Sequence, residues 1–404
     1  MSVRDGHVSQ ADRRARGAVS ALFFTNGAIY ANVIPRYPEI KEALGLSDTA
    51  YGLSIAALPV GALLSGLAAA ALIRRLGSAR LAAFGTVLLA LAVLCVGLSS
   101  VPFTFAAALF LVGLLDSVTD VGQNAHGLRV QRHYGRSIIN SFHAIWSLGA
   151  VAGGGMAALA IAFSLPLQVH LSITAVIFAT TGLVALKFCL PGKDEPAPEE
   201  TPERAVDVGA RPKLSPALIL TMSGLALIAI SATIVEDVGN SWAALYLRDS
   251  LSATAALSAA GYITLIGFQF VGRLCGDGLI DRFGQRTVAR GGGLLIAVGM
   301  GAAVAFPSIP MTLLGFAAAG FGSAALVPAA MDAANNLPGL RPGSGLTVVT
   351  WLMRLGFLIS PLIIGLISDA TELRVSLLIV PVAGILILAL SPVLMKRRQA
   401  PGAS

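Results

Sequence analysis

Long apolar runs recur along the whole chain, and short polar segments separate them. About 20 apolar residues in a helix cross the roughly 30 Å hydrocarbon core of a bilayer. Helices and closed barrels satisfy their backbone in lipid, and continuous runs favour helices over ten-residue alternating strands. The sequence therefore predicts an all-α membrane protein with twelve transmembrane helices. The expected spans are residues 18–38, 49–73, 79–100, 102–128, 138–164, 167–190, 215–246, 252–280, 287–306, 309–337, 343–369 and 373–395.

The composition excludes a soluble globular protein. Hydrophobic residues make up 55% of the 404 residues and charged residues only 12%, with a mean hydropathy of +0.79. Soluble domains are about a quarter charged. The first apolar run is too long for a signal peptide and lacks a persuasive cleavage site, so we expect it to be retained as a span.

Lys and Arg residues are distributed unevenly between the two sets of loops. Of the 28, 22 lie in the two tails and the even-numbered turns, whereas only Arg36, Lys41, Arg248 and Arg374 lie in the opposite set. Positive residues stay preferentially in the cytoplasm, so both termini are predicted to be cytoplasmic. The net charge of +7 is spread over short loops at helix ends, which indicates orientation in the membrane and no nucleic-acid partner.

One long polar stretch, Pro191 to Lys213, divides the chain between the sixth and seventh spans. It is rich in Pro and in charges of both signs, which is typical of a disordered linker. The expected organisation has five parts: a cytoplasmic tail at 1–17, a six-helix bundle at 18–190, a cytoplasmic linker at 191–214, a second six-helix bundle at 215–395 and a cytoplasmic tail at 396–404.

Glycines at matching positions indicate that the two bundles are duplicated units. Three pairs of glycines are each 207 residues apart: Gly77 and Gly284, Gly113 and Gly320, and Gly149 and Gly356. A register that holds across several spans predicts two pseudo-symmetric halves. Parallel six-helix repeats occur in one large class of transporters, in which the solute site lies between the halves near the middle of the bilayer.

The fourth span carries polar residues that an apolar helix has no reason to retain. Asp116, Asp120 and Gln123 share one helical face, and Asn124 lies beside them. An ionised Asp at the bilayer centre costs about 2.5–3.5 kcal/mol, so its retention indicates a hydrated cavity, a partner or protonation. The alternative is that these groups only hydrogen-bond neighbouring helices.

Further polar and aromatic residues inside the spans are candidates for binding a polar solute. They are Asn26 and Tyr30 in span one, Asn140, His143 and Trp146 in span five, Asn240 in span seven, Asn335 in span ten, and Trp351 and Arg354 in span eleven. An aromatic face packs on the C–H surface of a sugar, while amides and carboxylates bind its hydroxyls. Each of these residues can instead serve only to pack or bond helices together. We expect Gly239 to permit a break in span seven and Asp237 to lie at a hydrated helix end.

Buried acids are the candidates for proton coupling. Asp120, Glu236 and Asp332 fall within predicted spans, where a carboxyl group can bind and release a proton as its surroundings change. Arg354 needs a partner in the membrane, and we expect Asp332 or Asp120 to supply it. A static buried ion pair is the alternative for this arginine.

A second group of charges follows the eighth span and is predicted to act as a gate. Asp277 and Asp281 follow Arg273 at i+4 and i+8, and Arg282 comes next. These residues lie near the predicted cytoplasmic end of the helix, so we expect a role in conformational switching and not in solute contact.

Motifs of enzymes and cofactor sites are absent from the sequence. There is no G-x-x-x-x-G-K-[ST] phosphate loop, no H-E-x-x-H metal motif and no G-x-S-x-G elbow. Cys95, Cys189 and Cys275 have no pair spacing, so neither a disulfide framework nor a metal site is expected. The sequence predicts no enzyme and no cofactor, and a carrier driven by an ion gradient and not by ATP.

The segment "GDGLIDRFGQR" resembles the loop signature of the major facilitator superfamily, approximately G-x-L-x-D-R-x-G-R-R. Asp281, Arg282, Gly284 and Arg286 match it, whereas the first copy has Arg74 where the signature has aspartate. With the twelve spans and the central linker, this resemblance implies the major facilitator fold and a secondary active transporter in the bacterial inner membrane. The partners it implies are a small polar solute, protons and membrane lipids, and we expect a monomer.

Within that superfamily the sequence is similar to the fucose-permease-like branch and its poorly characterised bacterial relatives. Asp120 and Asn124 resemble its acid-x-x-x-Asn motif, and Glu236, Trp242 and Tyr246 its Glu-x5-Trp-x3-Tyr motif. The resemblance implies transport of a sugar-like or inositol-like solute by alternating access, coupled to protons through Asp120. The alternative is a proton-coupled multidrug or metabolite exporter, although "LGAVAGGGMAA" lacks the proline of the drug exporters' span-five pattern.

Overall fold

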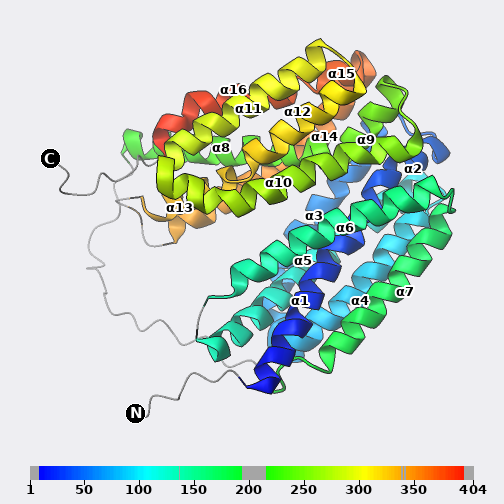
Figure 1. Cartoon of the computed structure of the whole chain (residues 1–404), viewed down its shortest axis with the longest axis vertical. Coiled ribbons are helices and arrows are strands. Elements are labelled where there is room, and N and C mark those ends of the chain that lie inside the picture. The colour runs from blue at the N-terminus through cyan, green and yellow to red at the C-terminus, as the bar shows by residue number, and fades with distance from the viewer. Residues whose placement is uncertain (1–8, 136, 193–214, 338–339, 341–342, 395–404) are drawn as a thin grey trace. The chain divides into compact units, whose positions relative to one another are not determined.

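The computed structural model describes residues 9–135, 137–192, 215–337, 340 and 343–394. All regular structure in these residues is helical, and twelve of the helices are long and apolar enough to cross a membrane (Figure 1). The predicted all-α fold with twelve transmembrane helices is therefore confirmed. Most of the predicted linker, residues 193–214, lies outside the described part of the chain.

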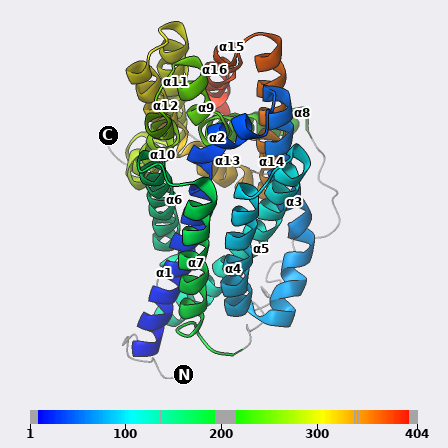
Figure 2. The ribbon, with the colours of Figure 1, turned by 90° about the vertical axis from the view of Figure 1, so that its right-hand side faces the viewer.

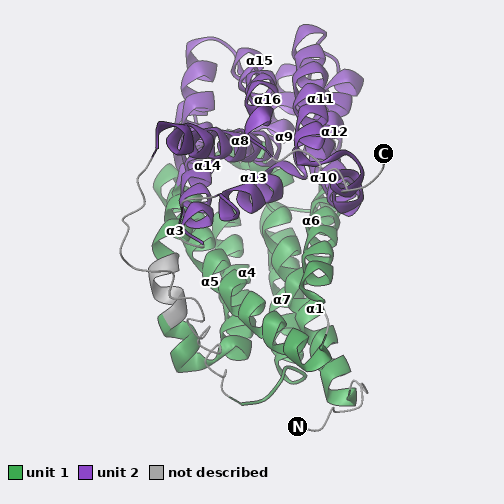
Figure 3. Ribbon diagram, turned by 90° about the vertical axis from the view of Figure 1, so that its left-hand side faces the viewer, with its two compact units in different colours: residues 1–44, 57–196 green, residues 45–56, 197–404 purple. Residues whose placement is uncertain are grey.

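The chain forms two compact units, which are described separately (Figure 3). Unit 1 consists of residues 1–44 and 57–196, and unit 2 of residues 45–56 and 197–404. The helices of the first half are α1 (Gln10–Ala31), the short η1 (Ile34–Arg36) and α2 (Tyr37–Ala43), α3 (Asp48–Leu76), α4 (Ser78–Gly97), α5 (Pro102–Tyr134), α6 (Ile139–Ala162) and α7 (Leu167–Leu186).

Several spans of the second half are interrupted helices. Its elements are α8 (Pro216–Ser241), α9 (Ala243–Leu245), η2 (Tyr246–Ser250), α10 (Ala255–Phe283), α11 (Gln285–Ala305), α12 (Ile309–Ser323), α13 (Leu326–Asn335), α14 (Ser344–Ala370), α15 (Leu373–Ser376), α16 (Ile379–Leu390) and η3 (Ser391–Val393). The predicted break at Gly239 is wrong, because α8 continues to Ser241. Gly239 is instead a packing position, where a Cβ would overlap the Leu265 side chain on α10.

The helices pair in the same way in both units. In unit 1, α1 packs on α6, and α4 packs on α5 and α7. In unit 2 the corresponding helices repeat this arrangement, with α8 on α14, and α11 on α12 and α16. The contacts of α7 with α1 and α4 can be followed in Figures 1 and 2.

Equivalent glycines confirm the duplicated register in atomic detail. Gly77 and Gly284 adopt the same backbone conformation, with φ of 81° and 80°, which side chains rarely adopt. A Cβ at Gly113 would overlap the carbonyl oxygen of Leu58, and a Cβ at Gly320 would overlap that of Leu265. Leu58 and Leu265 are themselves 207 residues apart, so the same close helix crossing occurs twice.

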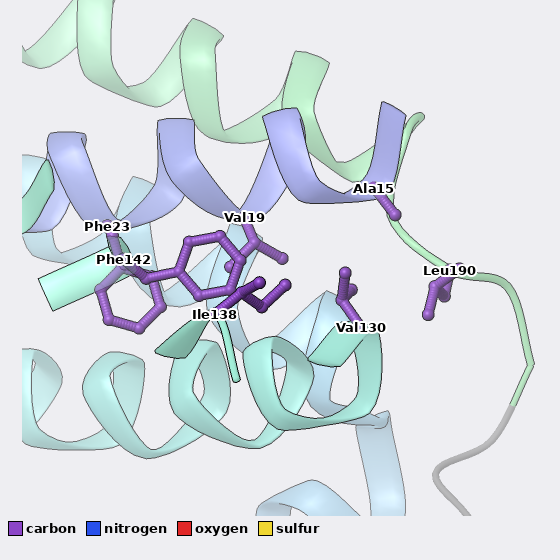
Figure 4. Close-up of a cluster of buried hydrophobic side chains, with 7 residues drawn as sticks. All are labelled: Ala15, Val19, Phe23, Val130, Ile138, Phe142 and Leu190. Carbon is purple, nitrogen blue, oxygen red and sulfur yellow. The ribbon is translucent and has the colours of Figure 1, made fainter. Parts of the chain in front are cut away.

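An apolar cluster fixes the helices of unit 1 that carry the polar residues of span four. Phe23 of α1 and Phe142 of α6 stack with ring centroids 5.4 Å apart, and Val130 of α5 packs with them (Figure 4). These side chains are 0% exposed. Between membrane-spanning helices such close packing stabilises the contact through van der Waals attraction. The cluster therefore holds α1, α5 and α6 in a fixed relation.

Candidate functional site

A chain of hydrogen bonds links three helices of unit 1. Trp146 Nε1 on α6 donates to Asn26 Oδ1 on α1 at 2.8 Å, and Asn26 Nδ2 donates to Asp116 Oδ1 on α5 at 2.8 Å. Asn26 is buried, whereas Asp116 and Trp146 are half-buried. The side-chain amide therefore fixes both the indole and the carboxylate, and leaves part of each exposed for a ligand.

One helical turn further along α5, Asp120 accepts hydrogen bonds from two neighbouring side-chain amides. Gln123 Nε2 donates to Asp120 Oδ1 at 3.2 Å, and Asn124 Nδ2 donates to the same oxygen at 2.8 Å. Asp120 is half-buried and Gln123 is 0% exposed. We call the six residues of these two paragraphs the unit 1 polar cluster: Asn26, Asp116, Asp120, Gln123, Asn124 and Trp146.

The duplicated half shows that the fold does not require the acids of this cluster. The residues 207 positions after Asp116 and Asp120 are Ser323 and Val327. At the position that corresponds to Asn26, Thr233 Oγ1 donates to the Met353 backbone carbonyl at 3.1 Å. The same helix crossing thus forms without carboxylates, so the acids of unit 1 need another explanation.

Other predicted residues of unit 1 lie near the ends of helices or at the edge of the cluster. The hydroxyl groups of Tyr30 and Tyr37 are hydrogen-bonded at 2.6 Å. His143 is exposed and its ring meets the edge of Phe23, with centroids 5.3 Å apart. Asn140 is exposed in the first turn of α6, so the structure does not bring it into the unit 1 polar cluster.

Unit 2 contains a separate charged group between α8 and α10. Gln269 Nε2 donates to Glu236 Oε2 at 3.0 Å, and Arg273 NH2 lies 3.9 Å from the same oxygen. Arg273 was expected to act together with Asp277 and Asp281, but its described ion pair is with Glu236. Asp277 and Asp281 are exposed further along α10. Their role as a gate stays a prediction.

Asp332 lacks the burial expected from the sequence, and Arg354 lacks one of its two expected partners. Asp332 is exposed and not buried, and it accepts hydrogen bonds from Gln285 Nε2 at 2.6 Å and Asn336 Nδ2 at 3.0 Å. Arg354 does not pair with Asp332; its guanidinium lies over the Trp351 ring, 5.5 Å from the centroid. A cation on an aromatic face gains about 0.5–1 kcal/mol at exposed sites, so the ring partly replaces the expected carboxylate.

The remaining predicted residues of unit 2 are placed at helix ends. Asn240 is half-buried in the last turn of α8, and Asn335 is the exposed last residue of α13. Arg282 is exposed and its guanidinium lies over the ring of Phe283, at 5.3 Å. None of these three joins the Glu236 group through a described hydrogen bond.

The sequence profile of the Major Facilitator Superfamily matches residues 19–278 and 225–403, which together cover most of the chain. The chain belongs to the Major Facilitator Superfamily. This family assignment agrees with the twelve helices and with the repeated glycine contacts of the two halves. The protein is therefore a multi-pass membrane transporter.

Curated relatives of this transporter are similar over nearly their whole length. An uncharacterized transporter, y4wD, of Sinorhizobium fredii is 30% identical over 379 residues, which cover 93% of this chain and 97% of the relative. The membrane protein MosC of Rhizobium meliloti is 26% identical over 381 residues, or 94% and 90% of the two chains. These similarities show that the chain has poorly characterised bacterial relatives within the superfamily.

Solved structures of other transporters have the same fold. The nucleoside transporter NupG gives a TM-score of 0.71 with 12% identity and covers 94% of this chain and 98% of its own. A bacterial homologue of the human lysosomal transporter Spinster gives 0.72 with 15% identity, covering 98% and 100%. At these identities the likeness shows the fold alone.

The structure also reveals a buried acid that the sequence interpretation placed at a hydrated helix end. Asp237 of the transporter is 5% exposed, and Ser241 Oγ donates to its Oδ1 at 3.2 Å. A serine at i+4 from an acid in a predicted span was the available signal, because it lies on the same helical face. Ser360, which faces Asp237 from α14, could not be found from spacing.

Proposed function

We propose that this Major Facilitator Superfamily transporter moves a small polar, sugar-like or inositol-like solute across the bacterial inner membrane by alternating access. Protons bound at Asp120 drive the transport. Both termini are cytoplasmic, as the distribution of Lys and Arg favours. The substrate class rests on the chemistry of the unit 1 polar cluster together with the resemblance to the fucose-permease-like branch.

The observation that carries the proposal is the asymmetry between the two halves. Unit 1 holds Asp116 and Asp120 one turn apart on α5, whereas the duplicated positions hold Ser323 and Val327. Polar groups in a membrane span are costly and are retained mainly for function. Because the same helix crossing exists without acids in unit 2, binding of solute or protons best explains their presence in unit 1.

The donors and acceptors of the cluster suit a polyhydroxylated solute. Carboxylate oxygens of Asp116 and Asp120 accept hydrogen bonds from hydroxyl groups, and the Asn124 amide offers both a donor and an acceptor. Trp146 supplies an apolar face in a fixed orientation because Asn26 holds its N–H. An apolar face with a few oriented polar groups is the usual composition of a small-molecule site.

Asp120 is the proposed proton site because the free energy of its ionisation depends on how much water reaches it. It is half-buried beside two neutral amides, and no described Lys or Arg forms an ion pair with it. Ionisation in such a place is costly, and contact with water makes it less so. Proton binding therefore has different free energies in states that differ in hydration, which is the requirement for coupling.

The test combines a binding screen with transport by the purified protein. A thermal-shift screen covers hexoses, inositols, amino sugars and a lipophilic cation, tetraphenylphosphonium. Any solute that stabilises the protein is then assayed in proteoliposomes, both for counterflow at equal pH and for accumulation driven by a pH gradient. We expect Asp120→Asn to retain counterflow and to lose pH-driven accumulation.

Glu42→Gln is the matched control, because Glu42 is an exposed acid outside the unit 1 polar cluster. It should behave like the wild type in both assays. Full pH-driven accumulation by Asp120→Asn would remove the coupling assignment. Stabilisation by tetraphenylphosphonium and by none of the polyols would favour the exporter alternative.

A further inference from the structure

Unit 2 contains a carboxyl group that neither the Glu236 ion pair nor the unit 1 polar cluster uses. Asp237 follows Glu236 on α8 and is 5% exposed. An isolated carboxylate in an apolar interior costs far more free energy than a neutral carboxyl group. A group in this position must therefore be compensated by a cation, by hydrogen bonds to its charged form, or by a bound proton.

Hydrogen bonds to Asp237 do not compensate a full charge. Ser241 Oγ donates to Oδ1 at 3.2 Å, but Oδ2 has no hydrogen-bond partner. Ser360 Oγ on α14 is 0% exposed, faces the carboxyl group and also has no partner. A serine hydroxyl already carries a hydrogen, so Ser360 can donate to an ionised Asp237 or accept from a protonated one. Ser241 and Ser360 are both neutral donors, and two neutral donors replace little of the hydration that a carboxylate loses on burial.

Charged side chains do not compensate Asp237 either. None of the described Lys, Arg or His residues forms an ion pair with it, and Arg273 is paired with Glu236. The neighbouring acid Glu236 opposes a second negative charge. The phenol group of Tyr51 bonds the Ser241 carbonyl on the same helix, and it is not a cation at neutral pH.

We infer that Asp237 is a second proton-binding site of this protein, in which the proton lies on Oδ2 and is shared with Ser360 Oγ. The bond that forms is a hydrogen bond from the carboxylic O–H to the serine hydroxyl oxygen. A sodium ion at the same place needs several oxygen ligands, whereas Asp237, Ser241 and Ser360 supply few. A proton needs no ligand beyond the carboxyl oxygen that carries it, and it removes the buried charge.

The beginning of α3, which belongs to unit 2, closes over this site. Tyr51 Oη donates to the Ser241 carbonyl oxygen at 2.7 Å, and its ring meets the edge of the Trp242 ring with centroids 5.1 Å apart. A Cβ at Gly52 would overlap the carbonyl oxygen of Pro361, the residue after Ser360. Tyr51 and Trp242 are 0% exposed. Loss of the proton would leave a charge beneath this contact, and hydration of that charge requires the contact to open.

Infrared spectroscopy of the detergent-purified full chain tests the proton directly, without any solute. The wild type minus Asp237→Asn difference spectrum at neutral pH should contain the C=O stretching band of a protonated carboxylic acid. Ser360→Ala should retain this band at a shifted frequency, because the hydrogen-bond partner is lost. Glu236→Gln is the matched control and should leave the band present.

Each other outcome contradicts the inference. A difference spectrum with carboxylate bands alone means that Asp237 is ionised, and replacement of the acid band on addition of NaCl means that sodium occupies the site. If Asp237→Asn does not fold, Ser360→Ala is compared with the wild type instead. A spectrum in which every carboxyl band is unchanged would also contradict the inference.

The closing role of α3 is tested by hydrogen–deuterium exchange of residues 45–56. At each pH the wild type and Asp237→Asn are compared, so that the intrinsic exchange rate cancels. We expect exchange to rise at alkaline pH in the wild type and to stay low in Asp237→Asn, which mimics the neutral acid. Equal exchange in both proteins at every pH would overturn the closing role. A role of Asp237 in coupling rests on the proposed function. Neither the infrared nor the exchange measurement needs transport, so the proton site and the proposed function can fail separately.

Discussion

A hydrogen bond joins Trp146 of α6 to Asn26 of α1, in which the indole Nε1 donates to the amide Oδ1 at 2.8 Å. The same amide then donates to Asp116 at 2.8 Å. The orientation of an aromatic surface is thus tied to a carboxylate on a third helix. This relationship makes Asn26 a positioning residue for the proposed solute site.

Replacement of Asn26 should weaken solute binding without loss of the fold. Asn26→Leu removes both hydrogen bonds, so Trp146 loses its fixed orientation and Asp116 loses a donor. One hydrogen bond contributes about 1 kcal/mol, which corresponds to roughly a fivefold loss of affinity. Thermal-shift titration with a solute found in the screen measures the affinity.

The control for this variant is Trp351→Phe, since Trp351 is an exposed indole in unit 2 at 54%. Trp351 was a candidate solute residue in the sequence, but the Arg354 guanidinium covers its ring, so this variant should retain wild-type affinity. An unchanged affinity in Asn26→Leu would show that the orientation of Trp146 contributes nothing to binding. Indole fluorescence in the Trp351→Phe background, with and without Asn26→Leu, reports whether the environment of Trp146 has changed.

The repeated helix crossing predicts a pair of stability effects. Gly113→Ala places a methyl group against the Leu58 carbonyl oxygen, and Gly320→Ala places one against that of Leu265. Overpacking of this kind costs about 1–3 kcal/mol. Both variants should therefore melt at a lower temperature in detergent, whereas Gly155→Ala, where the Cβ meets nothing within 4 Å, should not. A neutral effect at only one of the pair would mean that the two crossings are not equivalent.

The sequence predicted the fold well because a membrane span depends on the length and the hydropathy of an apolar run. Hydropathy is a property of each residue by itself, so it can be read without knowing the packing. The 207-residue register was also readable, since close helix crossings require glycine at Gly113 and Gly320. Interrupted helices were not readable in the same way. The break between α12 and α13 at Ala324 and Ala325 involves ordinary helix-forming residues, so no local signal marks it.

The candidate site was predictable only where its residues lie on one helix. Asp116 and Asp120 were found because helical periodicity places them on one face of α5. Partners on other helices depend on packing, which spacing does not contain. For this reason Glu236 was found but its contact with Arg273 was not, and Asp237 was placed at a hydrated end although Ser360 faces it from α14.

A buried histidine in unit 1 predicts a further stability effect. Leu190 N–H donates to His126 Nε2 at 3.2 Å, so the ring proton lies on Nδ1, which is 3.0 Å from Ser78 Oγ. His126→Ala leaves the Leu190 amide without this partner, which costs about 1–3 kcal/mol for a buried donor. The melting temperature should fall clearly. His133→Ala is the control, because His133 is exposed and exposed ion pairs contribute about 0–1 kcal/mol. Equal melting temperatures for the two variants would contradict a structural role for His126.

Asp332 provides the sharpest contrast with Asp120, since both were predicted from sequence to bind protons. Asp332 is exposed and accepts hydrogen bonds from Gln285 and Asn336, so it lacks the half-buried surroundings of Asp120. Coupling requires a group whose surroundings differ between the states of the transporter, and burial is what makes hydration matter for a carboxyl group. We therefore expect Asp332→Asn to keep pH-driven accumulation in proteoliposomes at about the wild-type level, under conditions in which Asp120→Asn loses it. Loss of accumulation with counterflow intact in Asp332→Asn would instead make Asp332 a coupling residue, because that pattern separates the proton step from solute binding.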